Sequence, residues 1–278
     1  MAHAFTASKI EQAARFHDEN GFVVFSDILS HEEFATLRAA VDVALTEGRL
    51  RVGEGDFVSN NDIVFADARF EALCRHPKIV TIARKLIGHP IELQHAKFNA
   101  KPLKDQGAGT VRWHQDYPFY PHTNYDMVSS IVHLDDEDEH AGPVRFIQGS
   151  HKWGPLSHVA PDGKFAYECT GRLDLDDLPS TLITGPAGQV SFHHCLTLHT
   201  SAPKRRPGHR RFVVFQYRAV DAVQMAGVVW RCNGMAVEER SPEPRMARFP
   251  DGATVELRGL GGRLFDMAGR LAPDRPAP

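Results

Sequence analysis

The sequence lacks the features that define several large classes of protein. Its four cysteines, Cys74, Cys169, Cys195 and Cys232, are scattered and form no C-x-x-C pair, which favours reduced thiols over a disulfide framework. The N-terminus has neither the basic segment nor the apolar segment of a secretory signal, and no apolar run approaches the length of a transmembrane helix. We therefore expect a cytoplasmic protein that does not contact a membrane.

An excess of charge is also lacking. Lysine and arginine number 32, aspartate and glutamate number 35, and the formal net charge is −3. These totals carry no sign of a nucleic-acid-binding protein, which would be strongly basic. Histidine is abundant, at 16 residues, so only spacing and context can separate candidate ligands from structural histidines.

Helical patterns occupy the first third of the chain. Residues 8–20 have the spacing of a short amphipathic helix. Ser30 and Glu33 fit a capping box, in which each side chain accepts a hydrogen bond from the other residue's backbone N–H. That box begins a helix that ends at Gly48, and a further helix covers residues 77–86.

From residue 91 onward the pattern changes to strands. The polar stretch Arg49–Asn61 predicts a loop, whereas residues 94–101 alternate, with His95, Lys97 and Asn99 on one face. Short β-type runs follow, separated by glycine and proline, at 129–134, 144–147, 181–183, 190–194, 196–199 and 212–217. Such spacing is typical of a β-sandwich or barrel.

Neither an internal repeat nor a linker divides the chain. We therefore expect one domain over residues 1–278. It would consist of a helix-rich part (1–90), a β core (about 91–220) and a C-terminal extension (221–278). Within that extension, residues 254–257 fit a strand and residues 272–278 fit a frayed end.

The stretch with the clearest chemical meaning is Trp113-His114-Gln115-Asp116. Residues two apart on an extended strand point to the same face, so the His114 imidazole and the Asp116 carboxylate would project side by side. A third ligand from another strand would complete the two-histidine, one-carboxylate set that suits non-haem Fe(II). An H-x-D pair alone is weak evidence, because it occurs by chance in many chains.

A downstream segment supplies a candidate third ligand. If Gln189–His199 is one strand, alternation places His193 and His199 on one face and His194 on the other. The strand after it begins at Arg210. A guanidinium there could lie near the metal and hold a carboxylate through two parallel hydrogen bonds.

Five motifs run through the chain. They are W-H-Q-D at 113–116, H-L-D-D-E-D-E-H-A-G-P at 133–143, Q-G-S-H-K at 148–152, L-H-T-S-A-P at 198–203 and Arg210-Arg211. Together they resemble the phytanoyl-CoA dioxygenase family of Fe(II)/2-oxoglutarate oxygenases. The resemblance implies a mainly β fold with flanking helices: a double-stranded β-helix, or cupin-like jelly roll, with a helical N-terminal part.

The same resemblance implies roles for single residues. Arg210 matches the arginine that binds the distal carboxylate of 2-oxoglutarate, while Arg211 would face the other way. Ser201 matches a hydroxyl that assists with that carboxylate, and His95 falls near a polar contact to the other end of the cosubstrate. The iron ligands implied are His114, Asp116 and His199.

The implied activity is that of an Fe(II)- and 2-oxoglutarate-dependent dioxygenase that uses O2, with ascorbate as an accessory reductant. It would hydroxylate a small-molecule metabolite and release succinate and CO2. The presence of Asp116 favours hydroxylation, because the related halogenases lack this carboxylate. The substrate does not follow from the resemblance, since specificity lies in loops.

Two other functions could use the same residues. A Zn(II)-dependent hydrolase could use the three ligands, but it gives no role to Arg210 and Ser201. A non-catalytic metal-binding jelly roll could sense or store a ligand. Only the oxygenase should show the visible charge-transfer band of an iron-chelated 2-oxoacid.

The remaining polar groups fit structural positions. The acidic run Asp135–Glu139 fits a solvated turn, and the basic cluster Lys204–Arg211 fits a polar turn from which Arg210 alone points inward. Three histidines fit the same interpretation: His151, His193 and His194. His193 shares a face with His199 and could instead support a ligand or face the substrate, although a core position fits it better.

Overall fold

The computed structural model describes residues 4–52, 58–101, 109–172, 174–239 and 245–257. Helices occupy much of the part before residue 90, as predicted: α1 (Ile10–Asn20), α2 (His31–Thr46), α3 (Ala68–Cys74) and α4 (Pro77–Ile87). The capping box is present at the start of α2, where the Glu33 N–H donates to Ser30 Oγ at 3.2 Å and the Ser30 N–H donates to Glu33 Oε2 at 2.8 Å. Helix α3 was not predicted, because its seven residues are too few to show a helical period.

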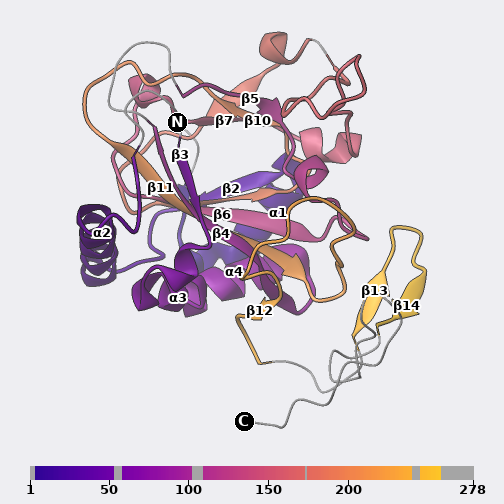
Figure 1. Cartoon of the computed structure of the whole chain (residues 1–278), viewed down its shortest axis with the longest axis horizontal. Coiled ribbons are helices and arrows are strands. Elements are labelled where there is room, and N and C mark those ends of the chain that lie inside the picture. Colours follow the sequence, from indigo (N-terminus) through magenta and orange to yellow (C-terminus); the bar gives the residue numbers. More distant parts are fainter. Residues whose placement is uncertain (1–3, 53–57, 102–108, 173, 240–244, 258–278) are drawn as a thin grey trace.

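A larger sheet lies between the helices and a smaller sheet (Figure 1). Edge strand β3 (Val58–Asn61) pairs with β4 and lies off the main strand order. That order is β1 (Ala4–Phe5), β2 (Phe22–Phe25), β9 (Val190–His194), β6 (Met127–His133), β11 (Arg210–Ala219), β4 (Ile91–Lys101) and β12 (Met235–Ala236).

A smaller sheet faces it, in the order β5 (Val111–His114), β10 (His199–Ser201), β7 (Val144–Ile147) and β8 (Ser180–Leu182). Aromatic rings pack in part of the space between the two sheets, where Phe22 of β2 stacks on Phe146 of β7 with ring centroids 4.9 Å apart. The two facing sheets and the helical N-terminal part confirm the predicted jelly roll. The predicted strand near 254–257 is present as β14 (Thr254–Glu256), which pairs with β13 (Met246–Arg248).

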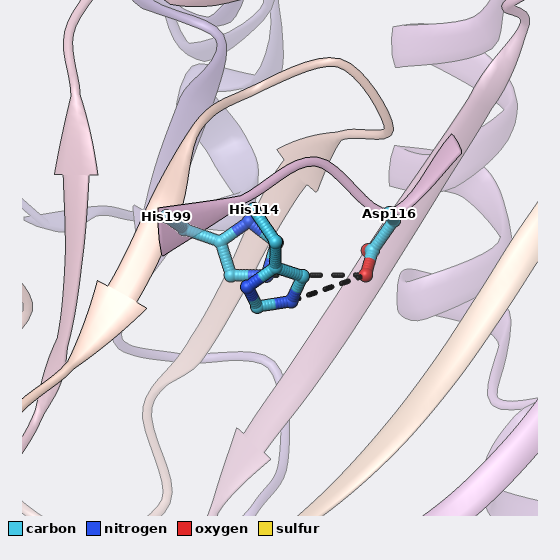
Figure 2. Close-up of side chains that lie close together, drawn as sticks. All are labelled: His114, Asp116 and His199. Atoms are coloured by element: carbon cyan, nitrogen blue, oxygen red, sulfur yellow. Dashed lines mark ion pairs between the residues drawn. The ribbon is translucent and has the colours of Figure 1, made fainter. Parts of the chain in front are cut away.

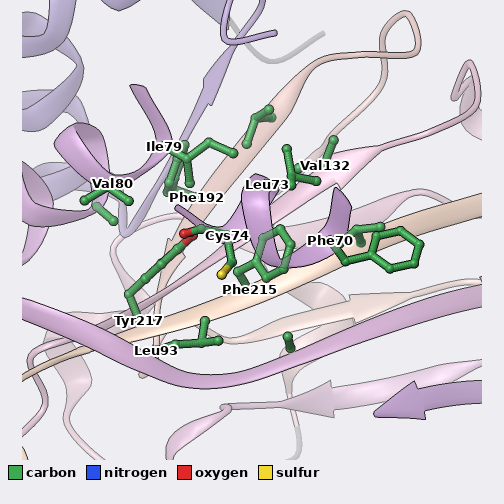
Figure 3. Close-up of a cluster of buried hydrophobic side chains, with 14 of the residues drawn as sticks. Phe70, Leu73, Cys74, Ile79, Val80, Leu93, Val132, Phe192, Phe215 and Tyr217 are labelled. Atoms are coloured by element: carbon green, nitrogen blue, oxygen red, sulfur yellow. The ribbon is translucent and has the colours of Figure 1, made fainter. Parts of the chain in front are cut away.

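The larger sheet is apolar on its outer face, where the helices pack (Figure 3). Alternation along β11 sends Phe215 and Tyr217 toward Phe70 and other helix residues, and sends Phe212 and Val214 into the space between the sheets. Burial of each large apolar side chain stabilises the fold by about 1.5–3 kcal/mol. The helices therefore seal one face and leave the other face free to line a site.

One predicted loop is in part a strand. Within Arg49–Asn61, residues 58–61 form β3, which pairs antiparallel with β4, while residues 53–57 lie outside the described part. Polar composition hid this strand because an edge strand is held by its backbone and can keep polar side chains. The expected frayed end at 272–278 also lies outside the described residues. No helix in the described ranges is long and apolar enough to cross a bilayer.

Candidate metal centre and cosubstrate cavity

The side chains of His114, Asp116 and His199 converge in the space between the two sheets (Figure 2). His114 ends β5, His199 begins β10, and the two residues are paired across these antiparallel strands. Nε2 of His114 lies 4.0 Å and Nε2 of His199 lies 3.9 Å from Asp116 Oδ1. All three ligand atoms lie within 4.8 Å of one another. The fold thus brings together the three ligands that the sequence predicted.

Both imidazoles leave the nitrogen that faces the site free for a metal. His114 Nδ1 donates to Arg112 O at 2.8 Å, and His199 Nδ1 donates to Thr197 O at 2.9 Å. Because a carbonyl can only accept, Nδ1 carries the proton and the Nε2 lone pair is available. Burial lowers the pKa of His114 to about 4 and holds the pKa of His199 well below its ordinary value, so both rings are neutral and able to bind a metal.

The two oxygens of the Asp116 carboxylate have different surroundings. Oδ2 accepts hydrogen bonds from Ser129 Oγ at 2.9 Å and from His193 Nε2 at 3.0 Å, whereas Oδ1 faces the two histidines. Burial acts to raise the pKa of Asp116, but the His193 hydrogen bond and nearby positive charge bring it well below its ordinary value. This fixed carboxylate with two neutral imidazoles fits the ligand set of a non-haem Fe(II) site.

The backbone that aligns the H-x-D pair is not the strand that was predicted. β5 ends at His114, and Asp116 has helical dihedrals (φ −67°, ψ −38°) at the start of the 3-10 turn Tyr117–Phe119. Period-two alternation therefore does not bring the two side chains together. The turn directly after the strand swings the carboxylate toward the imidazole.

The prediction of one strand over Gln189–His199 is wrong. β9 ends at His194, and a turn follows in which the Thr197 N–H donates to His194 O at 2.9 Å; His199 then begins β10 in the opposite sheet. His193 still reaches the site from β9. Its side chain is buried, as expected of the core histidine that was predicted, and its hydrogen bond to Asp116 also helps to hold a candidate ligand in place.

A cavity of about 140 Å³ adjoins the three ligands and is lined by both sheets. Its apolar wall includes Ile131, Phe212 and Val214. The polar residues that line it, besides the ligands, include Lys97, Asn99, Ser129, Thr200, Ser201 and Arg210. The structure therefore places predicted residues Ser201 and Arg210 in one cavity with the candidate metal ligands.

The two adjacent arginines point in opposite directions, as predicted. Arg210 lines the cavity, and its guanidinium lies 4.6 Å from the centroid of the Phe212 ring. Arg211 points to the other face of the sheet, where it pairs with Asp135 at 2.8 Å and Asp42 at 2.9 Å. Only Arg210 is placed to meet a ligand in the cavity.

His95 lies apart from the arginine. It pairs with Gln216 across the β4–β11 ladder, whereas Arg210 pairs with Lys101 at the other end, about 20 Å away along a strand. The His95 ring contacts the rings of Tyr120 and Trp230, with centroids 5.3 and 5.8 Å away. It does not line the cavity that holds Arg210.

Sequence reasoning did not select Lys97, although it lies on the same face of β4 as His95 and Asn99. Lys97 lines the cavity, and no other described residue forms a hydrogen bond or an ion pair with it. Burial lowers its pKa, while the Asp116 carboxylate acts in the opposite direction. A half-buried amine that no described residue pairs with is suited to an anionic group of a bound molecule. The alternation of β4 could have identified Lys97, because it places this residue on the same face as His95 and Asn99.

The prediction of a solvated turn over Asp135–Glu139 is wrong for its central residue. The side chain of Glu137 is 0% exposed, and His133 Nδ1 lies 2.8 Å from its Oε1. The basic cluster also contributes more than Arg210 to the interior, because Lys204 is buried and donates to the carbonyls of Arg206 and Gly208, both at 2.7 Å. Local composition alone could not show which of these charged side chains would be buried by other segments of the chain.

The metal-free protein is expected to lose stability steeply in mild acid. Burial lowers the pKa of His114 to about 4 and that of His122 and His194 to about 3, whereas histidine in an unfolded chain titrates near 6.5. Below that pH the unfolded chain binds protons that the folded protein does not, so stability falls as the pH falls toward the folded pKa values. The three histidines together should lower the free energy of unfolding by about 4 kcal/mol between pH 7 and 5.5.

Urea denaturation of chelator-treated protein at the two pH values measures this loss. His194→Gln is the control, because removing one such group should reduce the change by about 1.3 kcal/mol. An unfolding free energy that is the same at both pH values would show that these histidines are not buried in their neutral form.

The sequence profile of the phytanoyl-CoA dioxygenase (PhyH) family matches residues 17–212. A probable alpha-ketoglutarate-dependent hypophosphite dioxygenase of Stutzerimonas stutzeri is 35% identical over 213 residues, which cover 74% of this chain and 73% of the relative. An L-proline trans-4-hydroxylase of Streptomyces griseoviridis is 24% identical over 228 residues, 73% of this chain and 84% of the relative. Alpha-ketoglutarate is another name for 2-oxoglutarate.

Solved structures have the same fold. The epimerase SnoN in complex with Fe3+, alpha ketoglutarate and nogalamycin RO aligns with a TM-score of 0.70 and 20% identity, over 91% of this chain and 97% of that one. EctD from S. alaskensis with 2-oxoglutarate and 5-hydroxyectoine aligns with a TM-score of 0.67 and 20% identity, over 87% and 92%. At these identities the likeness establishes the fold.

Proposed function

The chain belongs to the phytanoyl-CoA dioxygenase family, which makes it an Fe(II)- and 2-oxoglutarate-dependent dioxygenase, and we propose that it hydroxylates a small polar molecule. One observation carries the proposal: two imidazoles and a carboxylate converge on a cavity whose wall also holds a buried arginine. A zinc hydrolase would have no use for that arginine. A storage protein would not need open metal positions beside a cosubstrate site.

In this proposal His114, Asp116 and His199 hold the iron. When bound, Fe(II) supplies the activation of O2 that couples the decarboxylation of 2-oxoglutarate, to succinate and CO2, with oxidation of the substrate. Ser129 and His193 keep one oxygen of Asp116 occupied, so that the other stays aimed at the metal. The two Nδ1 hydrogen bonds to backbone carbonyls fix the imidazole rings in the same way.

The cosubstrate is proposed to lie along the cavity between Lys97 and Arg210. Arg210 and Ser201 would bind the distal carboxylate, since a planar guanidinium can bind a carboxylate through two hydrogen bonds. The charge of Asp116 acts to raise the pKa of Lys97, and Lys97 would bind the carboxylate of the 2-oxoacid group close to the metal. His95 lies farther in the same direction along β4 and would contact the metal-side end of the bound molecules.

The primary substrate is proposed to approach on the side of the metal lined by aromatic rings. The Phe119 ring lies 5.5 Å from the His114 ring and 4.9 Å from the Phe165 ring, centroid to centroid. The relatives named for hypophosphite and L-proline support a small polar substrate. Rigid rings beside the metal would limit the size of the molecule that reaches it.

Two measurements test the proposal. Anaerobic titration with Fe(II) should give a visible charge-transfer band only when 2-oxoglutarate is also present. Under air, with Fe(II) and ascorbate, succinate formation should rise with one member of a panel of small polar compounds that includes hypophosphite and L-proline. Protein that binds the metal but gives neither the band nor succinate would favour the hydrolase or the non-catalytic protein.

A further inference from the structure

We infer that a buried network of side chains positions the guanidinium of Arg210 for the distal carboxylate of 2-oxoglutarate. This inference rests on the proposed function, because it concerns how the cosubstrate arginine is held. The network, hereafter the arginine network, consists of Ser191, His133, Glu137 and Arg210.

The contacts of the arginine network run in one direction, from the larger sheet to the cavity. Ser191 Oγ of β9 lies 3.0 Å from His133 Nε2 of β6, and His133 Nδ1 lies 2.8 Å from Glu137 Oε1. Glu137 Oε2 lies 3.1 Å from Arg210 Nε in an ion pair without the alignment of a hydrogen bond. Each group is thus oriented by the one before it.

The arrangement has the connectivity of a hydrolase triad, serine to histidine to carboxylate, but it cannot act as one. Ser191, His133 and the Glu137 side chain are all 0% exposed, so no substrate can reach the hydroxyl. The second oxygen of the carboxylate also faces an arginine. The geometry points to a role in holding that arginine.

A negative charge is needed at this end of the cavity. Arg210 pairs with Lys101 across the β4–β11 ladder, so two basic side chains are buried together. The Lys101 side-chain nitrogen is close enough to hydrogen-bond Ala202 O, and burial, followed by the charge of Arg210, lowers the pKa of Lys101 to about 6. Burial acts to raise the pKa of Glu137, but the charge of Arg210 and then the contact with His133 bring it down to about 2. Glu137 is therefore ionised and offsets a charge that would otherwise be costly to bury.

The contacts of Arg210 leave its terminal amino groups free. Glu137 faces Nε, and the Phe212 ring packs against the flat side of the guanidinium at 4.6 Å. Among the described residues, the two terminal amino groups have no hydrogen-bond partner, and Arg210 lines the cavity. A side chain that is held in its binding geometry loses less entropy when the ligand arrives. Glu137 and His133 are in this view positioning residues for cosubstrate binding.

The test compares two cosubstrates in anaerobic charge-transfer titrations with Fe(II). 2-Oxobutyrate has the same 2-oxoacid group as 2-oxoglutarate but lacks the distal carboxylate. Glu137→Ala should raise the Kd of 2-oxoglutarate about tenfold and change the Kd of 2-oxobutyrate by less than about twofold. His133→Leu should have the same selective effect, whereas His133→Asn, which keeps a donor for Glu137, should stay close to the wild type.

The outcomes separate the inference from its alternatives. If both cosubstrates weaken equally, Glu137 supports only the shape of the pocket, and the inference is overturned; an unchanged or lower Kd for 2-oxoglutarate also overturns it. If wild-type protein gives no band with either cosubstrate, the proposed function fails instead. If Glu137→Ala does not fold, Glu137→Gln replaces it, because glutamine keeps the shape and an acceptor for His133 but removes the charge. Glu137→Gln should also weaken the binding of 2-oxoglutarate selectively, by a smaller factor.

Discussion

Replacing Asp116 by alanine should abolish turnover while the protein stays folded. The substitution removes one of three proposed metal ligands and leaves Ser129 and His193 without their acceptor. A bound metal commonly contributes several kcal/mol of transition-state stabilisation, and each 1.4 kcal/mol corresponds to about tenfold in rate. We therefore expect succinate formation to fall by at least about 10³-fold, and His199→Ala to behave in the same way.

The measurement is iron-dependent succinate formation, with circular dichroism and thermal unfolding as the check on the fold. Asp162→Ala is the matched control, because this carboxylate is exposed and, among the described residues, pairs only with Lys164 in a surface turn; it should retain full activity. Full activity of Asp116→Ala without added halide would contradict the ligand assignment. If Asp116→Ala and His199→Ala both fail to fold, His199→Gln, which keeps a polar side chain of similar size, tests the ligand assignment by the same measurement.

Replacing Arg210 by alanine should chiefly weaken the binding of 2-oxoglutarate. Removing one partner of a buried charge pair costs about 3–5 kcal/mol, because the remaining charge stays uncompensated. We expect the Kd of 2-oxoglutarate to rise by about 100-fold or more. The Kd of Arg210→Lys for 2-oxoglutarate should lie between those of the wild type and Arg210→Ala. Lysine keeps the positive charge but lacks the planar guanidinium that binds both carboxylate oxygens.

The neighbouring arginine provides the control for this prediction. Arg211→Ala removes a similar side chain from the opposite face of β11, where it pairs with Asp135 and Asp42. It should lower thermal stability and leave the Kd of 2-oxoglutarate within about twofold of the wild type. Equal losses of affinity in the two variants would mean that Arg210 acts through the stability of β11 and does not contact the cosubstrate.

The sequence was sufficient to predict the fold class, the helical N-terminal part and the three residues that converge. His114, Asp116 and His199 could be selected because few residue types bind iron and because they stand in short motifs. The side of the sheet on which Arg210 lies could be predicted because adjacent residues of a strand face opposite ways. These are properties of single segments, and a linear pattern records them directly.

Other features depend on what packs over a segment, and no pattern along one segment records that. Glu137 stands in an acidic run that looks solvated, yet β11 and β6 cover it and supply Arg210 and His133 as partners. His193 contacts the candidate ligand Asp116, and its ring lies 4.7 Å from that of His199, centroid to centroid, because a turn after β9 carries His199 to the other sheet. A buried charge is stable only beside its partners, and here those partners come from distant strands that only folding brings together.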